Sequence, residues 1–243
     1  MSLPISPDTL TALSKLDTCA VTNAVESFGV RLRNEGFTDA SIQCRFPALP
    51  PMVGYAMTLR VRSSSPSWKG GVYLDRTDWW THLQRRPAPH ILVIEDEDRH
   101  PGTGAFIGAI HAAILQALGS AGAVTNGAAR DLPGIERLGF KVFSSNVAVS
   151  HAYMHIVEIG GPVKIGGLRI APGDLLHGDQ HGIVQIPAEI ADKIPETATR
   201  IRDREHRIVE YCQSPGFSLE GLTRLTGGNL HPASPPPDAT KGN

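Results

Sequence analysis

Apolar residues near the N-terminus recur every three or four positions, which is the spacing of one face of an α-helix. The pattern extends from Pro7 to Phe28. The pair Asp17-Thr18 interrupts it with residues that favour a helix start. We therefore predict two short helices, packed on the core, rather than one long helix.

Two runs of aliphatic residues follow and predict buried strands. They cover Gly54–Val61 and His90–Ile94, and a proline-rich turn at residues 46–52 precedes the first. Between them, residues 63–86 begin with a run of serines and contain Trp79-Trp80. We predict a loop followed by a short helix there.

The middle of the chain alternates between strand and helix patterns. An alanine- and leucine-rich helix is predicted at Gly108–Leu118, a strand at 123–125, a short helix at Leu132–Leu138 and a strand at Lys141–Phe143. Alternation over these lengths predicts a parallel sheet with helical crossovers. The fold class is therefore α/β.

Beyond residue 152 the pattern changes to short strands separated by glycine turns. The predicted strands are 152–159, 162–165, 168–170 and 182–186, and their turn chemistry favours an antiparallel sheet. A helix is then predicted from residue 188 to about 211, interrupted near Pro195, and either solvated or at a subunit contact. The proline-rich tail from about 227 is expected to be disordered.

Composition narrows the classes of partner. Lys and Arg (23) nearly balance Asp and Glu (24), so the net charge of −1 gives no electrostatic basis for binding nucleic acid. Cys19, Cys44 and Cys212 form no C-x-x-C pair, which argues against a disulfide scaffold or a zinc site. Neither a signal peptide nor a long apolar run is seen, so we expect a cytoplasmic protein without a membrane partner.

The most informative polar segment places Arg130 and Asp131 directly after a predicted buried strand. Open α/β sheets bind ligands at the carboxyl ends of their strands. The alternative is a surface ion pair in which Asp131 only caps the helix that begins at Leu132-Pro133. Residue types alone leave both interpretations open.

A second candidate is the start of the preceding helix, between Gly104 and His111. The first free amides of a helix attract carboxylates and phosphates, and glycine allows a ligand to approach. The alternative is that Gly104 and Gly108 only turn the chain against the sheet.

Several histidines and carboxylates are further candidates. His177, Asp179 and His181 could supply metal ligands or an acid–base pair, or could be structural, and both interpretations stay open. Asp174 is better explained by its Pro-Gly-Asp turn.

His151 and His155 lie on a predicted strand, about 13 Å apart, so they cannot share one ion. His151 is expected near the cleft and His155 in the sheet. The acidic run at residues 95–98 could be taken for a metal cluster, but it is better explained as a solvated loop.

These residues together resemble a known family. The segments that carry the resemblance are residues 16–24, Gly108 with its helix followed by Gly127-Ala-Ala-Arg130-Asp131, residues 138–143, and residues 172–184 with Pro172-Gly-Asp174 and Gly178-Asp179. They resemble the RraA-like family, which includes the regulator of ribonuclease E activity and class II aldolases of 4-hydroxy-4-methyl-2-oxoglutarate and 4-carboxy-4-hydroxy-2-oxoadipate. The resemblance covers roughly residues 8–215.

The resemblance implies an overall architecture. It predicts a ββα-type sandwich of the swivelling, phosphohistidine-domain kind as a catalytic domain at residues 8–215, with a C-terminal extension at 216–243. It also implies a homotrimer or a dimer of trimers, with active sites between subunits.

The resemblance also implies roles for the candidate residues. Asp131 would hold Mg²⁺ or Mn²⁺, largely through water, and Arg130 would bind the 2-oxo acid and stabilise its enolate. Backbone amides of Gly108, Ala109, Ile110 and His111 would bind the substrate carboxylate. A developing enolate needs such fixed positive charge beside it.

Two positions depart from the family pattern. Ala109 stands where aldolases commonly have an acid, and Asn126 stands where they commonly have an aspartate. His111 is a candidate to take over the catalytic role of the missing acid, because a helix N-terminus favours neutral imidazole. The alternative is that His111 faces the sheet and packs.

The leading expectation is thus a divalent-metal-dependent lyase that cleaves a 2-oxo acid, by retro-aldol reaction or by decarboxylation of oxaloacetate. The competing expectation is a non-catalytic protein that inhibits an RNA-degradation enzyme; such regulators lack the aspartate found here as Asp131. A methyltransferase is disfavoured because no glycine-rich cofactor loop is present. Trp79, Trp80, Tyr153 and the histidines are candidates to shape a pocket for a substrate bulkier than 4-hydroxy-4-methyl-2-oxoglutarate.

Overall fold

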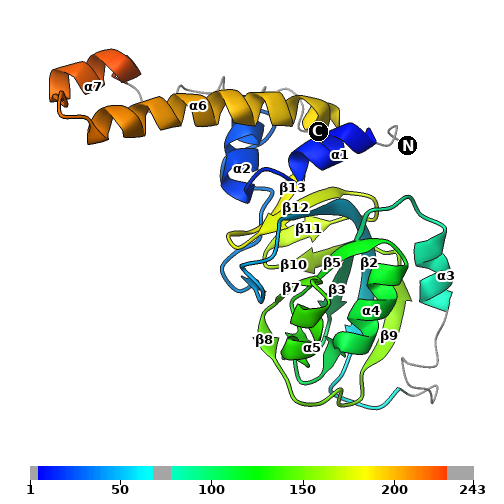
Figure 1. Cartoon of the computed structure of the whole chain (residues 1–243). Helices are drawn as coiled ribbons and strands as arrows, with labels where there is room; N and C mark the ends of the chain where they lie inside the picture. Colours follow the sequence, from blue (N-terminus) through cyan, green and yellow to red (C-terminus); the bar gives the residue numbers. More distant parts are fainter. Residues whose placement is uncertain (1–4, 68–77, 229–243) are drawn as a thin grey trace.

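The apolar run at residues 90–94 is the centre of the main β-sheet. The computed structural model describes residues 5–67 and 78–228, and in this part of the chain the main sheet has eight strands in the order β1-β7-β5-β3-β2-β12-β13, with β9 also paired to β2 (Figure 1). The strands are β1 (Gln43–Cys44), β2 (Met52–Arg62), β3 (His90–Asp96), β5 (Ser120–Thr125), β7 (Lys141–Ser144), β9 (His155–Ile159), β12 (Leu175–Asp179) and β13 (Gly182–Ile186).

Strands β2, β3, β5 and β7 are parallel to one another, as the alternating pattern predicted. Three helices accompany them: α3 (Asp78–Gln84), α4 (Ala109–Ala117) and α5 (Leu132–Arg137). Leu92 and Ile94 pack in one hydrophobic cluster with Leu115 of α4. Ile91 and Val93 pack in another with the antiparallel hairpin β10 (Val163–Ile165) and β11 (Leu168–Ile170). Burial on both faces explains why β3 is a continuous apolar run.

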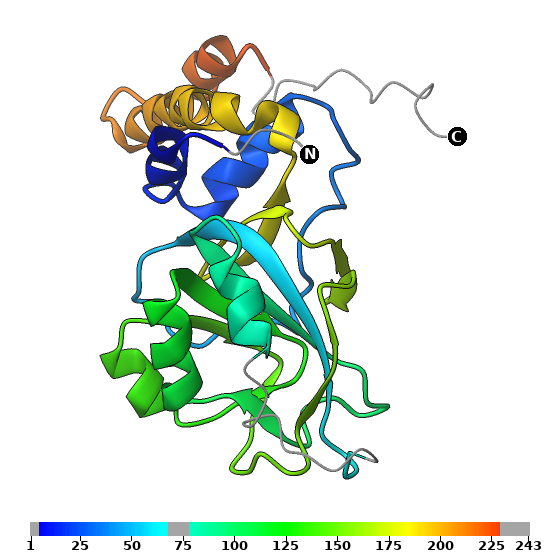
Figure 2. The same ribbon diagram turned by 90° about the vertical axis from the view of Figure 1, so that its right-hand side faces the viewer.

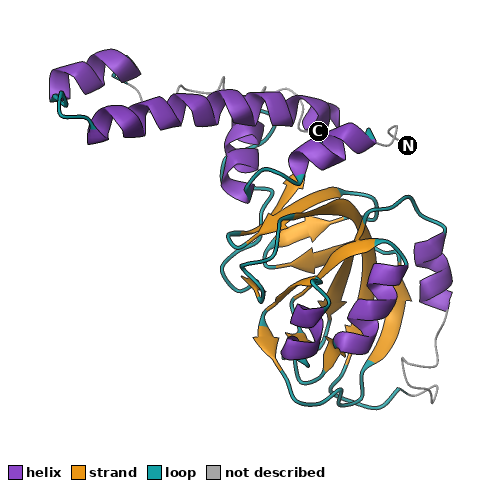
Figure 3. Ribbon diagram, in the orientation of Figure 1, coloured by secondary structure: helices purple, strands orange, loops and turns teal. Residues whose placement is uncertain are grey.

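The N- and C-terminal helices form a separate layer next to β12 and β13 (Figures 2 and 3). They are α1 (Pro7–Leu13), α2 (Thr18–Ser27), a 3₁₀ helix (Ala188–Lys193), α6 (Ile194–Gln213) and α7 (Leu219–Thr226). The side chains of Ser6 and Asp17 cap α1 and α2, which confirms the predicted break. Pro195 lies in the first turn of α6, where proline is tolerated, so the predicted interruption is also confirmed.

Three short parallel strands form a second sheet, in the order β4-β6-β8. They are β4 (Ala105–Ile107), β6 (Ala128–Ala129) and β8 (Asn146–Val147). Along the chain, each follows one of the parallel strands β3, β5 and β7. This second sheet was not predicted, because two- and three-residue strands carry too little periodicity to be recognised.

Two further elements differ from expectation. Strand β12 was not among the predicted strands, since its residues were treated as candidate-site residues; it is buried and paired with both β2 and β13. The strand predicted at 152–159 begins only at His155, since Ala152 has a positive φ of 49°. The predicted C-terminal extension contains α7, and its tail at residues 229–243 lies outside the described residues.

No helix within the described ranges combines the length and apolar character needed to cross a membrane.

Candidate active site

The carboxyl ends of the second sheet bring the main candidate residues together. β4 leads into Gly108, and β6 leads into Arg130 and Asp131. The amide of Arg130 donates a hydrogen bond to the carbonyl of Ile107 (2.9 Å). A Cβ atom at Gly108 would lie 3.4 Å from Arg130 Cγ and 4.0 Å from Asp131 Cβ. The start of α4 and the Arg130–Asp131 pair, two separate candidates in the sequence, therefore lie side by side.

Asp131 has an unusual backbone conformation. Its φ of 55° and ψ of 41° lie in the left-handed region, which non-glycine residues adopt at a cost and mostly at functional positions. It precedes α5 as the N-cap residue, yet its side chain makes no capping hydrogen bond. Within the described part of the chain its carboxylate also has no ion pair, and it is exposed to solvent. The simple capping explanation therefore does not account for this aspartate.

Gly134 keeps space for the Asp131 carboxylate. A Cβ atom at this position would lie 3.1 Å from both carboxylate oxygens and 2.7 Å from the Cβ of Ala109. Any side chain at 134 would thus displace the carboxylate or the first residue of α4. Glycine at position 134 therefore leaves the space beside the Asp131 carboxylate open.

The first turn of α4 supplies backbone donors beside Arg130. Gly108 is the N-cap in an extended conformation and provides no side-chain cap. The first hydrogen bond of the helix runs from the Ala112 amide to the Gly108 carbonyl, so the amides of Ala109, Ile110 and His111 have no partner inside the helix. Such amides bind anions.

The His111 side chain lies in the core. It is 3% exposed, and its ring centroid is 5.1 Å from that of Phe106 and 5.8 Å from that of Trp79. Burial, together with nearby His151, lowers the pKa of His111 to about 4, so the imidazole is neutral near pH 7. The neutral state of the His111 imidazole agrees with expectation. Its burial favours the alternative in which the side chain only packs. A catalytic role for this side chain stays a prediction.

The aromatic residues expected to shape a pocket are arranged differently. Trp79 is 1% exposed and packs against Phe106, so it is a core residue, and the expectation that it lines a substrate pocket is wrong. Its burial follows from the position of α3 against the main sheet. Tyr153 is exposed in the segment before β9.

His177 and Asp179 of β12 form hydrogen bonds with residues of the N-terminal helices and of the turn between them. The imidazole Nε2 of His177 donates to the carbonyls of Leu13 and Leu16, and its Nδ1 accepts from the hydroxyl of Thr18 (3.0 Å). This residue is fully buried, and burial lowers its pKa. Of the two alternatives left open by the sequence, the structural one therefore describes His177.

Asp179 makes a related set of contacts. Its carboxylate accepts from the amide of Thr18 (2.9 Å), and from the amide and the ring of His181 (2.8 and 3.0 Å). Burial opposes ionisation of Asp179, but these hydrogen bonds outweigh it and lower its pKa. Asp174 accepts from Ala171 and Gln185, as expected for its turn.

His151 and His155 do not form a shared site. The Nδ1 of His151 donates to the Ala105 carbonyl (2.9 Å), and that of His155 donates to the Tyr153 carbonyl (2.8 Å). His151 therefore secures the segment after β8 against β4. Among the described residues, no group of three or more His, Cys, Asp or Glu side chains could hold a metal ion.

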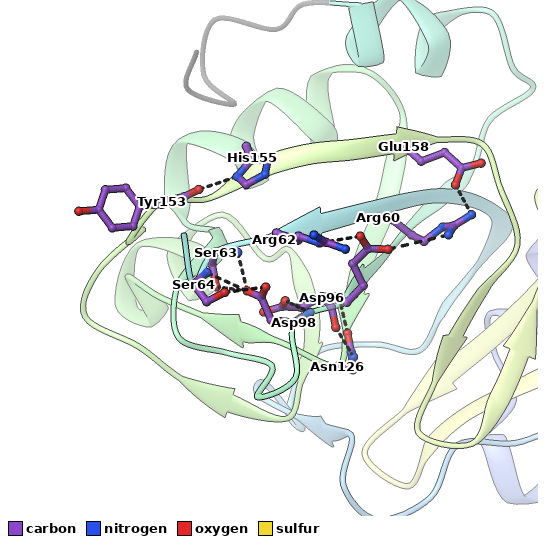
Figure 4. A network of polar contacts seen from close by, with 11 residues as sticks. Arg60, Arg62, Ser63, Ser64, Asp96, Asp98, Asn126, Tyr153, His155 and Glu158 are labelled. Atoms are coloured by element: carbon purple, nitrogen blue, oxygen red, sulfur yellow. Dashed lines mark hydrogen bonds and ion pairs between the residues drawn. The ribbon is translucent and has the colours of Figure 1, made fainter. Parts of the chain in front are cut away.

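The acidic run at residues 95–98, at the end of β3, forms a network of hydrogen bonds and ion pairs (Figure 4). The Asp98 carboxylate accepts from the amides of Ser63 and Ser64, and Asp96 accepts from the amides of Asp98 and Gly102. Burial raises the pKa of Asp96, although these two amides oppose the shift. The run is not a metal cluster, but it is less solvated than predicted.

Asn126 belongs to the same network, and sequence reasoning had assigned it no positive role. Its Oδ1 accepts from the Asp96 amide (2.7 Å), and its Nδ2 donates to the Asp96 carbonyl (3.0 Å). An ionised aspartate could not donate the second bond. Asn126 therefore links the end of β3 to the turn before Arg130. Gly134 was also missed, since its proximity to Asp131 depends on the backbone alone.

Three comparisons place the chain among known proteins. The profile of the RraA-like family, described as Aldolase/RraA, matches residues 18–185. The chain is 34% identical over 93 residues to an uncharacterized protein of Methanocaldococcus jannaschii, covering 38% of this chain and 45% of that one. It is 31% identical over 99 residues to a Halalkalibacterium halodurans protein named "Putative 4-hydroxy-4-methyl-2-oxoglutarate aldolase", covering 40% and 47%. The aligned region thus spans less than half the length of these relatives.

Two solved structures share the fold across most of the chain. An uncharacterized protein from Pseudomonas syringae has a TM-score of 0.70 at 25% identity, covering 92% of this chain and 99% of that one. Streptomyces coelicolor RraAS2, described as an unusual member of the RNase ES inhibitor RraA protein family, has a TM-score of 0.65 at 21% identity, covering 85% and 98%.

Proposed function

The chain belongs to the RraA-like family, and we propose on that premise that it is a divalent-metal-dependent carbon–carbon lyase acting on a 2-oxo acid. The family includes aldolases as well as RNase E inhibitors, and one distant relative is named as an aldolase. The reaction is retro-aldol cleavage of a 4-hydroxy-2-oxo acid, decarboxylation of oxaloacetate, or both, since each forms the enolate of pyruvate.

The observation that carries this proposal is the position of Asp131. A negatively charged side chain is held in a left-handed backbone conformation beside Arg130, and neither side chain is used in a hydrogen bond or ion pair within the described ranges. Structural aspartates such as Asp179 and Asp98 each accept several hydrogen bonds instead. A carboxylate kept free in this way is suited to a ligand.

The donor set fits a hydrated divalent cation. Asp131 offers one carboxylate open to solvent, and Gly134 leaves the space around both oxygens clear. Mg²⁺ and Mn²⁺ accept one or two carboxylates and complete their shell with water. When bound, such a cation supplies positive charge for the oxygens of the 2-oxo acid.

Arg130 and the backbone amides of α4 would bind the substrate and stabilise its developing charge. Arg130 presents planar donors that bind carboxylate and enolate oxygens together, which stabilises negative charge as it develops. The amides of Ala109, Ile110 and His111 bind the substrate carboxylate at the start of α4. Gly108 lets the substrate approach both.

A second set of proposals concerns assembly. We propose a homotrimer or a dimer of trimers in which a neighbouring subunit completes the site. In support, the Arg130–Asp131 pair is at the surface of the single chain, where a neighbour can cover it.

The experiment is a screen for pyruvate release. Purified full-length protein is incubated with 4-hydroxy-2-oxo acids and with oxaloacetate, with Mg²⁺ or Mn²⁺ and with chelator. We expect metal-dependent release that Asp131→Asn reduces to less than about a tenth of wild type, a barrier increase of at least about 1.4 kcal/mol. Asparagine tolerates the left-handed conformation, so the variant should fold.

The control is Asp203→Asn, which removes the same charge from an exposed position on α6. Turnover in Asp131→Asn above about a tenth of wild type would refute the assignment. If the wild-type protein cleaves none of these substrates, the non-catalytic alternative is preferred, in which the protein inhibits an RNA-degradation enzyme.

A further inference from the structure

The turn between β5 and β6 leads directly to the Arg130–Asp131 pair. It consists of Asn126 and Gly127, and β6 adds only two residues before Arg130. Two residues supply few ladder hydrogen bonds, so pairing of β6 alone holds the chain weakly at this point. The position of Arg130 therefore depends on how the turn is held.

On one side, the Asn126 side chain connects this turn to β3. Its Oδ1 accepts a hydrogen bond from the Asp96 amide (2.7 Å), and its Nδ2 donates one to the Asp96 carbonyl (3.0 Å). The pairing of β3 with β5 ends at Ile94 and Thr125. Asn126 thus extends the connection between the two strands to the end of β3, and both hydrogen bonds come from one short side chain.

On the other side, Ser145 connects the same turn to the end of β7. Its hydroxyl donates a three-centre hydrogen bond to the carbonyls of Asn126 (2.6 Å) and Gly127 (2.9 Å), and its amide donates to the Gly127 carbonyl (3.1 Å). The pairing of β5 with β7 ends at Val124 and Phe143. Ser145 therefore supports the turn beyond the last paired residues of the main sheet.

Gly127 packs closely between these contacts. Its amide donates to the Thr125 hydroxyl (2.9 Å), and a Cβ atom at position 127 would lie 3.2 Å from both that oxygen and Asp96 Cβ. These distances are shorter than ordinary van der Waals contacts of carbon, so the turn lies directly against the end of β3. The turn therefore has little room to move toward β3.

Strand β6 connects the turn to the site. The Arg130 amide donates to the Ile107 carbonyl (2.9 Å), and the Ala148 amide donates to the Ala129 carbonyl (3.0 Å). These bonds join β6 to β4 and to the segment after β8, so a shift of the turn changes where Arg130 lies relative to the start of α4. An error of about 1 Å in such geometry can lower a rate roughly 100-fold.

We propose that Asn126 and Ser145 are positioning residues, which hold Arg130 and Asp131 in the geometry that the reaction requires by fixing the turn between β5 and β6. This inference rests on the proposed lyase function and assigns to the same site two side chains that act through the backbone. The contacts of both side chains lie within one chain, whatever a neighbouring subunit adds to the site.

The test removes the Ser145 hydroxyl from the full-length protein. With Mg²⁺ and the substrate that wild type cleaves best, Ser145→Ala is expected to lower kcat/KM for pyruvate release by roughly tenfold or more. Hydrogen exchange of residues 128–131 should become roughly tenfold faster, while the melting temperature stays within about 4 °C of wild type, because the loss is local. Ser145→Thr keeps the hydroxyl and should return both rates to within about threefold of wild type.

Asn126→Ala tests the contact with β3 and is expected to produce the same two changes, so the test stays decisive if Ser145→Ala fails to fold. The matched control is Ser27→Ala, which removes a hydroxyl that also donates to a backbone carbonyl (Ala24, 2.8 Å) but lies on α2. The control should change neither rate by more than about twofold.

Wild-type exchange and kinetics in both alanine variants would overturn the inference and leave the lyase function intact, and so would a Ser145→Thr variant as impaired as Ser145→Ala. If wild type cleaves no 2-oxo acid, the lyase function is refuted, and hydrogen exchange of residues 128–131 still decides whether the two side chains fix the position of Arg130.

Discussion

At the scale of single residues, two kinds of aspartate can be distinguished: those whose carboxylates accept hydrogen bonds from the protein, and those, such as Asp131, whose carboxylates accept none within the described ranges. Asp179, Asp98 and Asp96 each accept hydrogen bonds from backbone amides and thereby hold elements together. Arg130 and Asp131 lack such contacts within the described ranges. Their side chains are thus available to a ligand, which is why the proposed function rests on this pair.

Arg130 is expected to act through its shape as well as its charge. Arg130→Lys keeps the positive charge but removes the planar pair of donors that can bind two oxygens at once. We expect kcat/KM for pyruvate release to fall roughly 100-fold, or about 2.7 kcal/mol, with little change in thermal stability. Steady-state kinetics on the folded variant check this; kinetics like those of wild type would show that charge alone is sufficient.

His111 should make the stability of the protein depend on pH. Its pKa is about 4 in the folded state against 6.5 ordinarily, so between these values the unfolded chain binds more protons. Its contribution is complete above pH 6.5 and is lost as pH falls toward 4, amounting to about 2 kcal/mol between pH 6.5 and pH 5. Burial lowers the pKa of His177 as well, which adds a loss of the same sign.

Urea denaturation of wild type and His111→Leu at pH 5 and pH 7 isolates this contribution. The difference between the two pH values should be smaller in the variant by about 2 kcal/mol, whatever packing cost the substitution brings. An equal pH dependence in both proteins would contradict the prediction. Turnover of the folded variant also decides whether the His111 side chain takes part in catalysis.

At the scale of elements, α2 depends on polar contacts with β12 as well as on apolar packing. Asp179→Ala would leave the buried amide of Thr18 without its partner and would release His181. We expect a loss of about 2–4 kcal/mol in the free energy of unfolding and faster hydrogen exchange in α2. Asp174→Ala, in an accessible turn, serves as the control and should cost less than about 1.5 kcal/mol. Equal losses of stability in Asp179→Ala and Asp174→Ala would argue against a special role for the contact between Asp179 and the start of α2.

The second sheet positions the candidate residues. Its strands β4, β6 and β8 contribute only two or three residues each, but their pairing aligns Ile107 with Ala129, so that Gly108 and Arg130 each follow a paired residue. The Asn126 side chain connects the chain just before β6 to the end of β3. The position of Arg130 therefore depends on short strands and on one amide side chain.

At the scale of the whole molecule, α6 and α7 extend away from the sheet (Figure 1). The buried residues of α6 are Ile194, Thr197 and Ala198, all near its start. Farther along, Val209, Phe217, Leu219 and Leu225 are exposed apolar residues. This fits the expectation of a helix that is solvated or at a subunit contact.

Deletion of residues 208–243 tests whether this C-terminal part is solvated or lies at a subunit contact. Because residues 208–228, the described part of this segment, are mostly exposed, we expect the melting temperature of the remaining protein to change by less than about 4 °C. If the extension joins subunits, light scattering after size exclusion should show full-length trimers or hexamers and a smaller mass for the truncated protein. An unchanged mass would place the subunit contact elsewhere in the chain.

The sequence by itself determined the helices and the parallel strands, and it singled out Arg130 and Asp131 as candidate site residues. These depend on local periodicity, on capping residues such as Asp17, and on a motif that is contiguous in the chain. The same information predicted the break near Pro195 and the hairpin of β10 and β11. Local rules were sufficient there, because each feature involves neighbours in sequence.

Only the tertiary structure decided the role of each polar side chain. Sequence could not distinguish Asp179, which accepts three hydrogen bonds, from Asp131, which accepts none within the described ranges. Nor could it show that His111 and Trp79 face the core. Burial and pairing depend on residues that are distant along the chain, and their positions are set only when the two sheets pack and align.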